Sequence, residues 1–441
     1  MDQLIPSFAQ LVEKFAPCFR VEVFQTFTAM VAAWLVCLGR RSISRVWETT
    51  GQARQRNHKA AYRLFCAAAW DWDEVACILC TLIVTHLVPG AAVWVVVDDT
   101  LCHKRGAKVA FGGIFLDAVL SSKRHKVFRF GNNWVMLGIV VKIPCRTDRY
   151  FCLPVLWRVY EKKNNKDKQQ AAAHRTKGQL AAEMVLFLAE KWPTRKIMVV
   201  ADSAYVGRHL LQDRPANVQV LGPIRWDAAL STVATEPGKR VRGKRLPTPK
   251  QMLADDRRWP VQTLTVNFGT VPRQLHVKVV TDVCWDHAAG RTPLQLVLVR
   301  DPLGKWRDEA LVTTDLSLTA EETIGGYCRR WSVEVAFCEA KQLLGFHDPQ
   351  VRCPRSVERA APLAWFLGSL VVLWYVLSGK DGPQAERERP WYRHKVTPTF
   401  ADMLASCRLQ HWQAWLDEKS ASKAELQRKC AWLLNYIATA A

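Results

Sequence analysis

The chain has 441 residues, of which 49% are apolar, and 62 Lys and Arg against 40 Asp and Glu give a net charge of +22. This length and composition exclude collagen-like, disulfide-scaffold and disordered proteins, and they predict about two to four domains. In a folded, apolar-rich chain, such a positive charge favours a polyanionic partner over mere solubility. Nucleic acid is the commonest polyanion.

The 14 cysteines are irregularly spaced between Cys18 and Cys430. A chain of this length does not need disulfides, so we expect reduced thiols in a cytosolic protein. Cys77 and Cys80 lie in an apolar helical stretch with no second metal-binding pair nearby, which favours core packing over zinc. The N-terminal MDQLIPSFAQ lacks the charged start and apolar core of a signal peptide.

One uncharged stretch, Ala360–Gly379, is long enough to span a bilayer. It contains Pro362 and Gly368, and no second span of similar clarity exists. A helix buried on all sides inside a protein has the same pattern. We therefore expect a core helix and no membrane partner.

From Phe8 to Leu87 the apolar residues recur at helical spacing, which predicts a bundle of four or five helices. We assign residues 1–90 to this bundle and expect it to bind DNA. The stretch Arg40–Arg63 suits phosphate contacts, although a solvated basic face has the same composition. Against the single acid Glu48, its basic residues are Arg40, Arg41, Arg45, Arg54, Arg56, Lys59 and Arg63.

The next segments alternate between strand and helix patterns. Ala92–Val97 is a continuous β-branched run that ends in Asp98-Asp99-Thr100, which predicts a buried strand delivering carboxylates. Trp134–Ile143 and Tyr150–Tyr160 are predicted to form an antiparallel pair. A helical pattern follows at Gln170–Lys191.

A second short apolar strand, Ile197–Ala201, ends at Asp202, and a helix at Val206–Gln212 and a strand at Val218–Ile224 follow. This order is typical of a ribonuclease-H-like α/β domain, which we assign to residues 91–226. Two strand-end carboxylates can then lie side by side, and a third acid should come from a later helix.

The pattern then changes, since residues 227–313 contain a basic loop and short alternating strands, which predict an inserted antiparallel β subdomain. Its strands are expected at Val261–Val266, Leu275–Thr281, Gln295–Arg300 and Glu309–Thr313. The basic loop, Lys239–Lys250, has no acid and is either a DNA contact or a flexible charged loop. We assign 314–380 to the second part of the core and 381–441 to a C-terminal helical tail.

The stretch Tyr327–Lys341 lacks helix breakers and follows a helix-start signal at Thr319, with Glu322 three residues later. At about 100° per residue, four polar side chains share one helix face, whereas Glu339 lies on another. An ordinary ion pair on a solvated helix is the alternative explanation. The four residues of the shared face are Tyr327, Arg330, Glu334 and Lys341.

The spacing Tyr-x2-Arg-x3-Glu-x6-Lys resembles the signature of a branch of bacterial insertion-sequence transposases of the DDE class. The resemblance extends over Ala92–Gln350 and includes Asp99 followed by Thr100, Asp202 in a second strand-end motif, and a β insertion before Glu334. It implies that Asp99, Asp202 and Glu334 are the catalytic and metal-binding residues. Strand alternation alone does not separate Asp98 from Asp99, and the family pattern favours Asp99.

The resemblance implies two Mg²⁺ ions, about 4 Å apart and replaceable by Mn²⁺, that serve in-line displacement at phosphorus. It also implies DNA contacts, with Trp306 as the expected base-stacking residue and Trp285 as its rival, although either could belong to the core. The expected DNA-binding residues are Tyr327, Arg330, Lys341, Trp331, Trp306, Arg225, Lys239, Arg240, Arg242, Lys244 and Arg245.

The implied function is a transposase that binds the terminal inverted repeats of its element, cleaves the ends and joins the 3′-hydroxyls to target DNA. Its partners would be double-stranded DNA, at the element ends and at the target, and a second protomer in a paired-end complex. No small-molecule substrate is expected, and the location would be the bacterial cytoplasm, at the nucleoid. A ribonuclease-H-like nuclease without strand transfer and a non-catalytic DNA-binding regulator are the alternatives.

Overall fold

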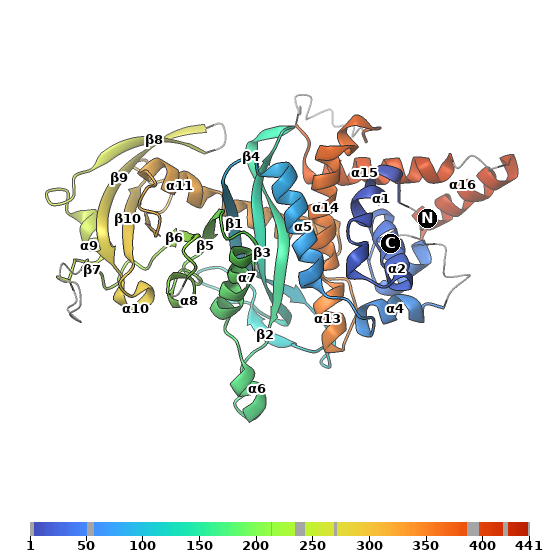
Figure 1. The fold of residues 1–441 in the computed structure, drawn as a ribbon, viewed down its shortest axis with the longest axis horizontal. Coiled ribbons are helices and arrows are strands. Elements are labelled where there is room, and N and C mark those ends of the chain that lie inside the picture. Colours follow the sequence, from blue (N-terminus) through green and yellow to red (C-terminus); the bar gives the residue numbers. More distant parts are fainter. Residues whose placement is uncertain are drawn as a thin grey trace.

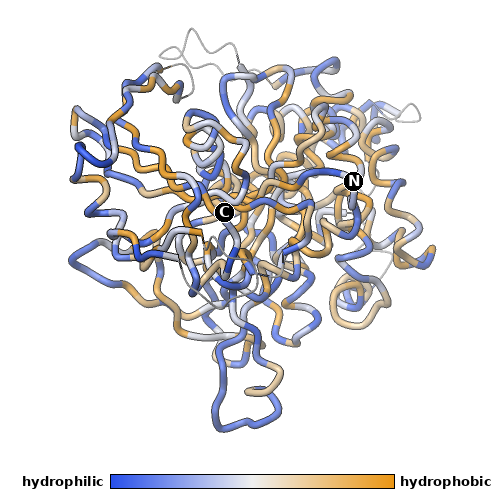
Figure 2. Tube along the Cα trace, turned by 60° about the vertical axis from the view of Figure 1, so that its left-hand side comes forward, coloured by the Kyte–Doolittle hydropathy of each residue, from blue (hydrophilic) through white to orange (hydrophobic). Residues whose placement is uncertain are grey.

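In the computed structural model, the described residues are 4–50, 57–212, 214–233, 243–268, 271–385, 397–417 and 422–439. Within these ranges one mixed sheet runs through the molecule, and helices cover it on both sides (Figure 1). Hydrophobic residues gather in the interior of this arrangement (Figure 2). The chain is therefore a mixed α/β protein.

The centre of the sheet has the strand order β4-β3-β1-β5-β6. β1 pairs antiparallel with β3 and parallel with β5, and β5 pairs parallel with β6. This order and these directions are consistent with the ribonuclease-H-like domain expected from the sequence. The bounds are β1 Ala92–His103, β3 Phe128–Ile143, β4 Arg146–Tyr160, β5 Lys196–Ala201 and β6 Val218–Pro223.

β1 is longer than the apolar run that predicted it. The strand continues past Val97 to His103 because β3 supplies hydrogen-bonding partners along this whole length, down to the pair His103 and Gly131. Asp98 and Asp99 therefore lie inside a strand and not after its end, and their side chains have fixed and opposite directions.

The strands expected as an insertion extend the same sheet, since β11 pairs with β6 through Leu311 opposite Pro223. A smaller hydrophobic cluster lies between these strands and α11 (Ala320–Cys328) and includes Val277, Val297 and Ile324. The remaining strands are β2 Gly113–Leu116, β7 Ser231–Thr232, β8 Gln262–Phe268, β9 Val271–Cys284, β10 Pro293–Arg300 and β11 Glu309–Thr313.

Most helices at both ends of the chain pack against the central sheet or each other in one hydrophobic cluster, to which the last helix, Lys423–Ala438, contributes no residue. Those before β1 are α1 Pro6–Glu13, η1 Ala16–Cys18, α2 Val21–Val36, α3 Ile43–Thr49, α4 Lys59–Cys66 and α5 Trp72–Leu87. Those within and after the sheet are α6 Lys168–Ala173, α7 Lys177–Lys191, α8 Arg208–Leu211, α9 Pro249–Ala254, α10 Asp286–Ala289, α12 Trp331–Leu343, α13 Pro354–Ala360, α14 Leu363–Leu377, η3 Gly379–Asp381, α15 Phe400–Leu416 and α16 Lys423–Ala438.

The long apolar stretch forms α14, which packs against β4, α12 and α15. The span Pro354–Leu377 is long and apolar enough to cross a membrane, but 89% of its apolar window is buried inside the protein. Ser369, the polar residue at its centre, donates a hydrogen bond to the carbonyl of Pro154 at 2.7 Å. The stretch is a core helix, as its Pro and Gly residues predicted.

The single helix expected over Tyr327–Lys341 is broken. α11 ends at Cys328, and α12 begins at Trp331. At the junction, Arg329 and Arg330 donate backbone hydrogen bonds to residues three positions earlier, which tightens the turn. The guanidinium of Arg329 stacks on Trp94 at 3.8 Å, so the junction is fixed on β1. The capping box of α11 at Thr319 forms as predicted.

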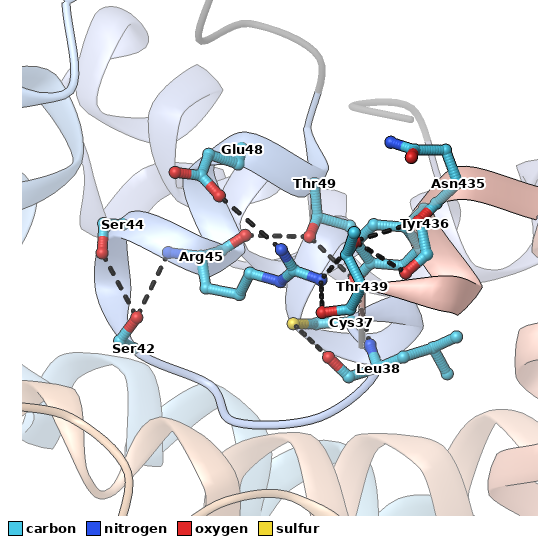
Figure 3. A network of polar contacts seen from close by, with 10 residues as sticks. All are labelled: Cys37, Leu38, Ser42, Ser44, Arg45, Glu48, Thr49, Asn435, Tyr436 and Thr439. Carbon is cyan, nitrogen blue, oxygen red and sulfur yellow. Dashed lines mark hydrogen bonds and ion pairs between the residues drawn. The ribbon is translucent and has the colours of Figure 1, made fainter. Parts of the chain in front are cut away.

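The C-terminal helix α16 contacts α3 near the N-terminus of the chain (Figure 3). The hydroxyl of Tyr436 accepts a hydrogen bond from Leu38 N at 3.0 Å and lies 3.0 Å from Thr49 Oγ1. Arg45 stacks over the ring of Tyr436 and donates to the carbonyl of Thr439. The two ends of the chain are thus held together.

Candidate functional site

Asp202, one of the predicted acids, lies next to Asp98, the neighbour of the predicted Asp99. Val97 of β1 is in register with Ala201, the last residue of β5, so Asp98 and Asp202 each directly follow a paired residue and lie within electrostatic range of each other. Parallel in-register residues point to the same face of a sheet. Burial, followed by the neighbouring charge of Asp202, raises the pKa of Asp98 to about 7.

Glu334, the third predicted acid, is linked to Asp98 by Arg330, which contacts both carboxylates. Arg330, at the junction of α11 and α12, donates from Nη1 to Asp98 Oδ2 at 2.9 Å and lies 3.5 Å from Glu334 Oε1. Asp202 lies within electrostatic range of the same guanidinium. Arg330 therefore stands among three carboxylates that come from β1, from the end of β5 and from α12.

Asp99 points to the other side of β1. Its Oδ2 accepts a hydrogen bond from Lys177 Nζ at 2.6 Å, and its Oδ1 accepts one from Tyr205 at 2.8 Å. Lys177 begins α7, which packs on β3, β4 and β5, whereas Arg330 belongs to the helices that approach Asp98. The alternation of strand side chains therefore brings Asp98, and not Asp99, to the face of Glu334.

The other residues of the Tyr-Arg-Glu-Lys spacing lie nearby. Lys341 Nζ donates to Thr100 Oγ1 at 2.6 Å, and burial lowers the pKa of this lysine. Tyr327 is half-buried, and the guanidinium of Arg330 lies 6.0 Å from its ring centroid. Arg330 and Lys341 contact β1 at Asp98 and Thr100. Glu334 and Tyr327 lie beside Arg330, and the four residues do not form one continuous helical stripe.

The carboxylates suit a divalent cation in kind, since Mg²⁺ prefers oxygen ligands and the crowding of Asp98 with Asp202 leaves negative charge to be neutralised. Within the described ranges, however, no group of three His, Cys, Asp or Glu side chains is placed to hold a metal ion. Arg330 now provides the positive charge between Asp98 and Glu334. The chemical type of the donors fits the ion, and a bound ion would take the place that Arg330 holds between Asp98 and Glu334.

The predicted base-stacking tryptophans occupy different surroundings. Trp306 is 39% exposed in the loop between β10 and β11, where the Arg273 guanidinium lies 4.1 Å from its ring centroid. Trp285 lines a cavity of about 570 Å³ together with Arg208 and His287. Trp285 is half-buried and packs against the main hydrophobic core, whereas Trp306 is exposed at the surface.

The remaining predicted DNA contacts lie on the surface. Trp331 is 68% exposed at the start of α12. Arg225 is exposed and forms two hydrogen bonds with Asp227. Lys244 and Arg245 are exposed near β7. Lys239, Arg240 and Arg242 lie outside the described residues.

One member of the N-terminal basic stretch is structural. Arg41 is buried, and its guanidinium donates hydrogen bonds to the carbonyls of Trp34 and Cys37. Its backbone N–H donates to Asp348 at 2.8 Å. The prediction of a phosphate contact is wrong for Arg41, because its guanidinium completes hydrogen bonds inside the core. Arg54 and Arg56 lie outside the described residues.

Three residues around the carboxylates were not predicted. Lys177 and Tyr205 bind Asp99, and Glu309 lies within electrostatic range of Arg330. Tyr205 stands three residues after Asp202, so its place next to the strand end was a usable signal. Lys177 and Glu309 had no such signal, because only the fold brings α7 and β11 to this place.

A family model described as DDE superfamily endonuclease matches residues 14–291, which is more than half of the chain. The matched region begins in the N-terminal helices and includes β1 and β5 with Asp98, Asp99 and Asp202. It ends before Glu334. No curated protein matches the chain.

Proposed function

Because the chain belongs to the DDE superfamily endonucleases, whose substrate is DNA, we propose that it is a transposase that cleaves the ends of an insertion sequence and joins them to target DNA. It would bind terminal inverted repeats through its basic surfaces and act as a homodimer that pairs two ends. The Tyr-Arg-Glu-Lys spacing is the reason for preferring this reading over a nuclease that only cuts. Asp98, Asp202 and Glu334 would be its catalytic carboxylates.

The observation that carries this proposal is the convergence of the three carboxylates on Arg330. Asp98 and Asp202 come from adjacent parallel strands, and Glu334 comes from a helix far away in sequence. A structural ion pair needs one carboxylate per arginine, whereas three around one guanidinium leave an excess of negative charge. Such an excess of negative charge favours the binding of cations, which in turn can bind the phosphate of a substrate.

The carboxylates would hold two Mg²⁺ or Mn²⁺ ions, which, when bound, activate the attacking hydroxyl and stabilise the leaving oxygen. Asp98 is already desolvated, so its negative charge is poorly compensated by water and favours a bound cation. Arg330 would turn from Asp98 to a phosphate oxygen, since a guanidinium binds either group with two donors. Once turned away from Asp98, Arg330 would contribute to the binding of DNA phosphate.

Lys341 and Tyr327 would fix the phosphates on either side of the cleaved bond. Lys341 is held by Thr100, two residues after Asp98, so its ammonium has a fixed position relative to the carboxylates. Tyr327 contributes a hydroxyl from the last turn of α11. These donors would orient phosphate without forming or breaking a bond, which is the positioning that in-line displacement needs.

The DNA contacts farther away follow from the sequence. We propose that Trp306 stacks on a displaced base, with Trp285 in its cavity as the alternative, and that Trp331, Arg225 and the basic loop contact the backbone. The basic loop is defined by Lys239, Arg240, Arg242, Lys244 and Arg245. Residues 1–90 would contribute further contacts to end DNA.

The test is an incision and joining assay with the full chain and a labelled duplex that carries one terminus of the DNA flanking its gene. With Mg²⁺ the wild type should cut at the terminus and join the 3′-end to a plasmid, whereas Ca²⁺ should support binding alone. Cutting without joining would favour the nuclease, and binding without cutting would favour the regulator. Glu334→Gln should bind but neither cut nor join, and cutting by this variant would remove Glu334 from the site.

A further inference from the structure

One exposed apolar surface, beside the His103 end of β1, has no partner within the described residues. The turn after β2, residues 117–126 and here named the tip, carries Val119 and Leu120 with 80% and 51% of their surfaces exposed. Ile114, Leu116 and Phe128, on β2 and the start of β3, are exposed beside it. Single exposed apolar residues are common, but a contiguous group marks a binding surface.

The tip is fixed to the strand that bears Asp98. Asp117 Oδ1 accepts hydrogen bonds from the backbone of Val119 and Leu120 at 3.0 and 3.1 Å. Its Oδ2 lies 2.6 Å from Nε2 of His103, the last residue of β1. The two apolar side chains therefore have a defined place relative to the catalytic strand, as an element that acts on a substrate needs.

The charges around the tip are basic. Lys123, Arg124 and Lys126 are exposed on the tip itself, and Asp117, its acid, is buried against His103. Next to it, residues 161–176, here named the arm, project from the body on the same side as β2 and are hydrophilic along most of their length (Figures 1 and 2). Exposed basic residues of the arm are Lys162, Lys163, Lys166, Lys168 and Arg175.

The arm and the β2 surface form one unit. Lys162 donates from Nζ to the carbonyl of Ile114 and lies 4.8 Å from the ring centroid of Phe115. The arm then leads into α7, whose first residue, Lys177, binds Asp99. The tip is thus joined to β1 at His103, and the arm is joined to it through Lys177, which binds Asp99.

We propose that the tip is a wedge that inserts Val119 and Leu120 between base pairs of the DNA duplex held at the active site. This proposal rests on the proposed function and adds to it the contact that deforms DNA. Apolar side chains surrounded by phosphate-binding cations suit unstacked bases, and proteins that bend DNA use such side chains to open a base step. The same surface of a second copy fits less well, because it would bring Lys123, Arg124 and Lys126 of both copies together.

The experiment measures base unstacking apart from cleavage. A set of duplexes carries one 2-aminopurine at successive positions around a flexible TA step, and binding is followed in Ca²⁺, which supports no cutting. The wild type should raise the fluorescence at one or two neighbouring positions. The double variant Val119→Ser with Leu120→Ser should lose most of this rise while its affinity falls by less than about tenfold, since phosphate contacts dominate affinity.

A matched control removes the same kind of exposed surface elsewhere. Leu434→Ser with Ile437→Ser, on α16, should leave the fluorescence rise at its wild-type value, because these exposed residues lie away from the tip (Figure 1). Because all four side chains are exposed, both double variants should keep the wild-type thermal midpoint. The triple variant of Lys123, Arg124 and Lys126 to Ala should lower the salt slope of binding by about 0.9 per lost contact.

The wedge proposal would be overturned if the wild type changed the fluorescence at no position, or if the tip variant gave the full wild-type change. A smaller oligomer of the tip variant in light scattering would also overturn it, because the tip would then be a contact between copies. Failure of the proposed function has a different signature. In that case the wild type does not cut terminal DNA in Mg²⁺, whatever its effect on 2-aminopurine.

Discussion

Arg330 donates a hydrogen bond to Asp98 at 2.9 Å, although 232 residues separate them in sequence. The same nitrogen lies 3.5 Å from Glu334, so one guanidinium neutralises carboxylates from β1 and α12. In this state Arg330 provides the charge that divalent cations would provide during catalysis. Metal binding and the release of Arg330 should therefore be linked.

The first prediction tests this linkage with Arg330→Gln. In a chelating buffer the variant should lose about 2 kcal/mol of stability, because buried Asp98 loses its cationic hydrogen-bond donor. Adding Mg²⁺ should raise its thermal midpoint by more than it raises that of the wild type. Arg225→Gln, which breaks an exposed pair with Asp227, is the control and should change neither value. Equal Mg²⁺ responses in Arg330→Gln and the wild type would show that no ion replaces this arginine.

A second prediction concerns Glu339, which the sequence placed away from the catalytic face. Its side chain is largely buried, 3.7 Å from Arg149, and burial raises its pKa from 4.5 to about 7. The folded protein then binds this proton more tightly than the unfolded chain, so ionisation lowers stability as the pH rises from 4.5 to about 7. Glu339→Gln should remove this penalty.

Thermal unfolding of Glu339→Gln and the wild type should therefore agree near pH 4, and the variant should be more stable by up to roughly 3 kcal/mol above pH 7. DNA cleavage should be unchanged, as expected for an acid on another face of α12. Glu190→Gln, on the exposed side of α7, is the control and should show no such divergence. A constant difference between Glu339→Gln and the wild type at every pH would contradict the prediction.

Two adjacent glycines of α11 allow a third prediction. A Cβ on Gly326 would lie 2.8 Å from Leu221 and from Trp94, whereas a Cβ on Gly325 would meet nothing within 4 Å. Gly326→Ala should cost about 1 to 3 kcal/mol and displace the junction that carries Arg330. Gly325→Ala should be neutral or stabilising, because Ala favours a helix by up to about 1 kcal/mol over Gly. Denaturant unfolding of both variants measures the difference, and equal stabilities would show that α11 tolerates the displacement.

The fourth prediction uses two positions of α14. Leu370 is fully buried, whereas Leu377 at the end of the same helix is 40% exposed. Leu370→Asp should aggregate or fail to fold because it buries an unpaired charge, and Leu377→Asp should be tolerated. Fractionation without detergent reports both outcomes. Recovery of the wild type only in membranes would contradict the assignment of α14 to the core.

The sequence predicted the central strands well because their signals are local. The β-branched run of β1, the antiparallel pair β3 and β4, and the capping box at Thr319 each depend on a few neighbouring residues. The break between α11 and α12 was missed because no Pro marks it. At the break Arg329 stacks on Trp94, a contact between distant parts of the chain that a local pattern does not contain.

The choice between Asp98 and Asp99 had the same difficulty. The sequence placed both at one strand end, and the family pattern pointed to Asp99. Only the direction of each side chain separates them, and that direction follows from the pairing of β1 with β3 and β5. The carboxylate that faces Glu334 could therefore not be chosen from spacing alone.

The fifth prediction, which tests the central claim most directly, is a comparison of Asp98→Asn with Asp99→Asn in cleavage of terminal DNA in Mg²⁺. Both substitutions keep the size of the side chain and remove one charge. If Asp98, Asp202 and Glu334 form the catalytic set, Asp98→Asn should reduce cleavage by at least about a thousandfold while binding persists. Asp99→Asn should retain cleavage within about tenfold, since it weakens contacts to Lys177 and Tyr205 on the other face. The reverse result, with Asp98→Asn active and Asp99→Asn inactive, would contradict the assignment.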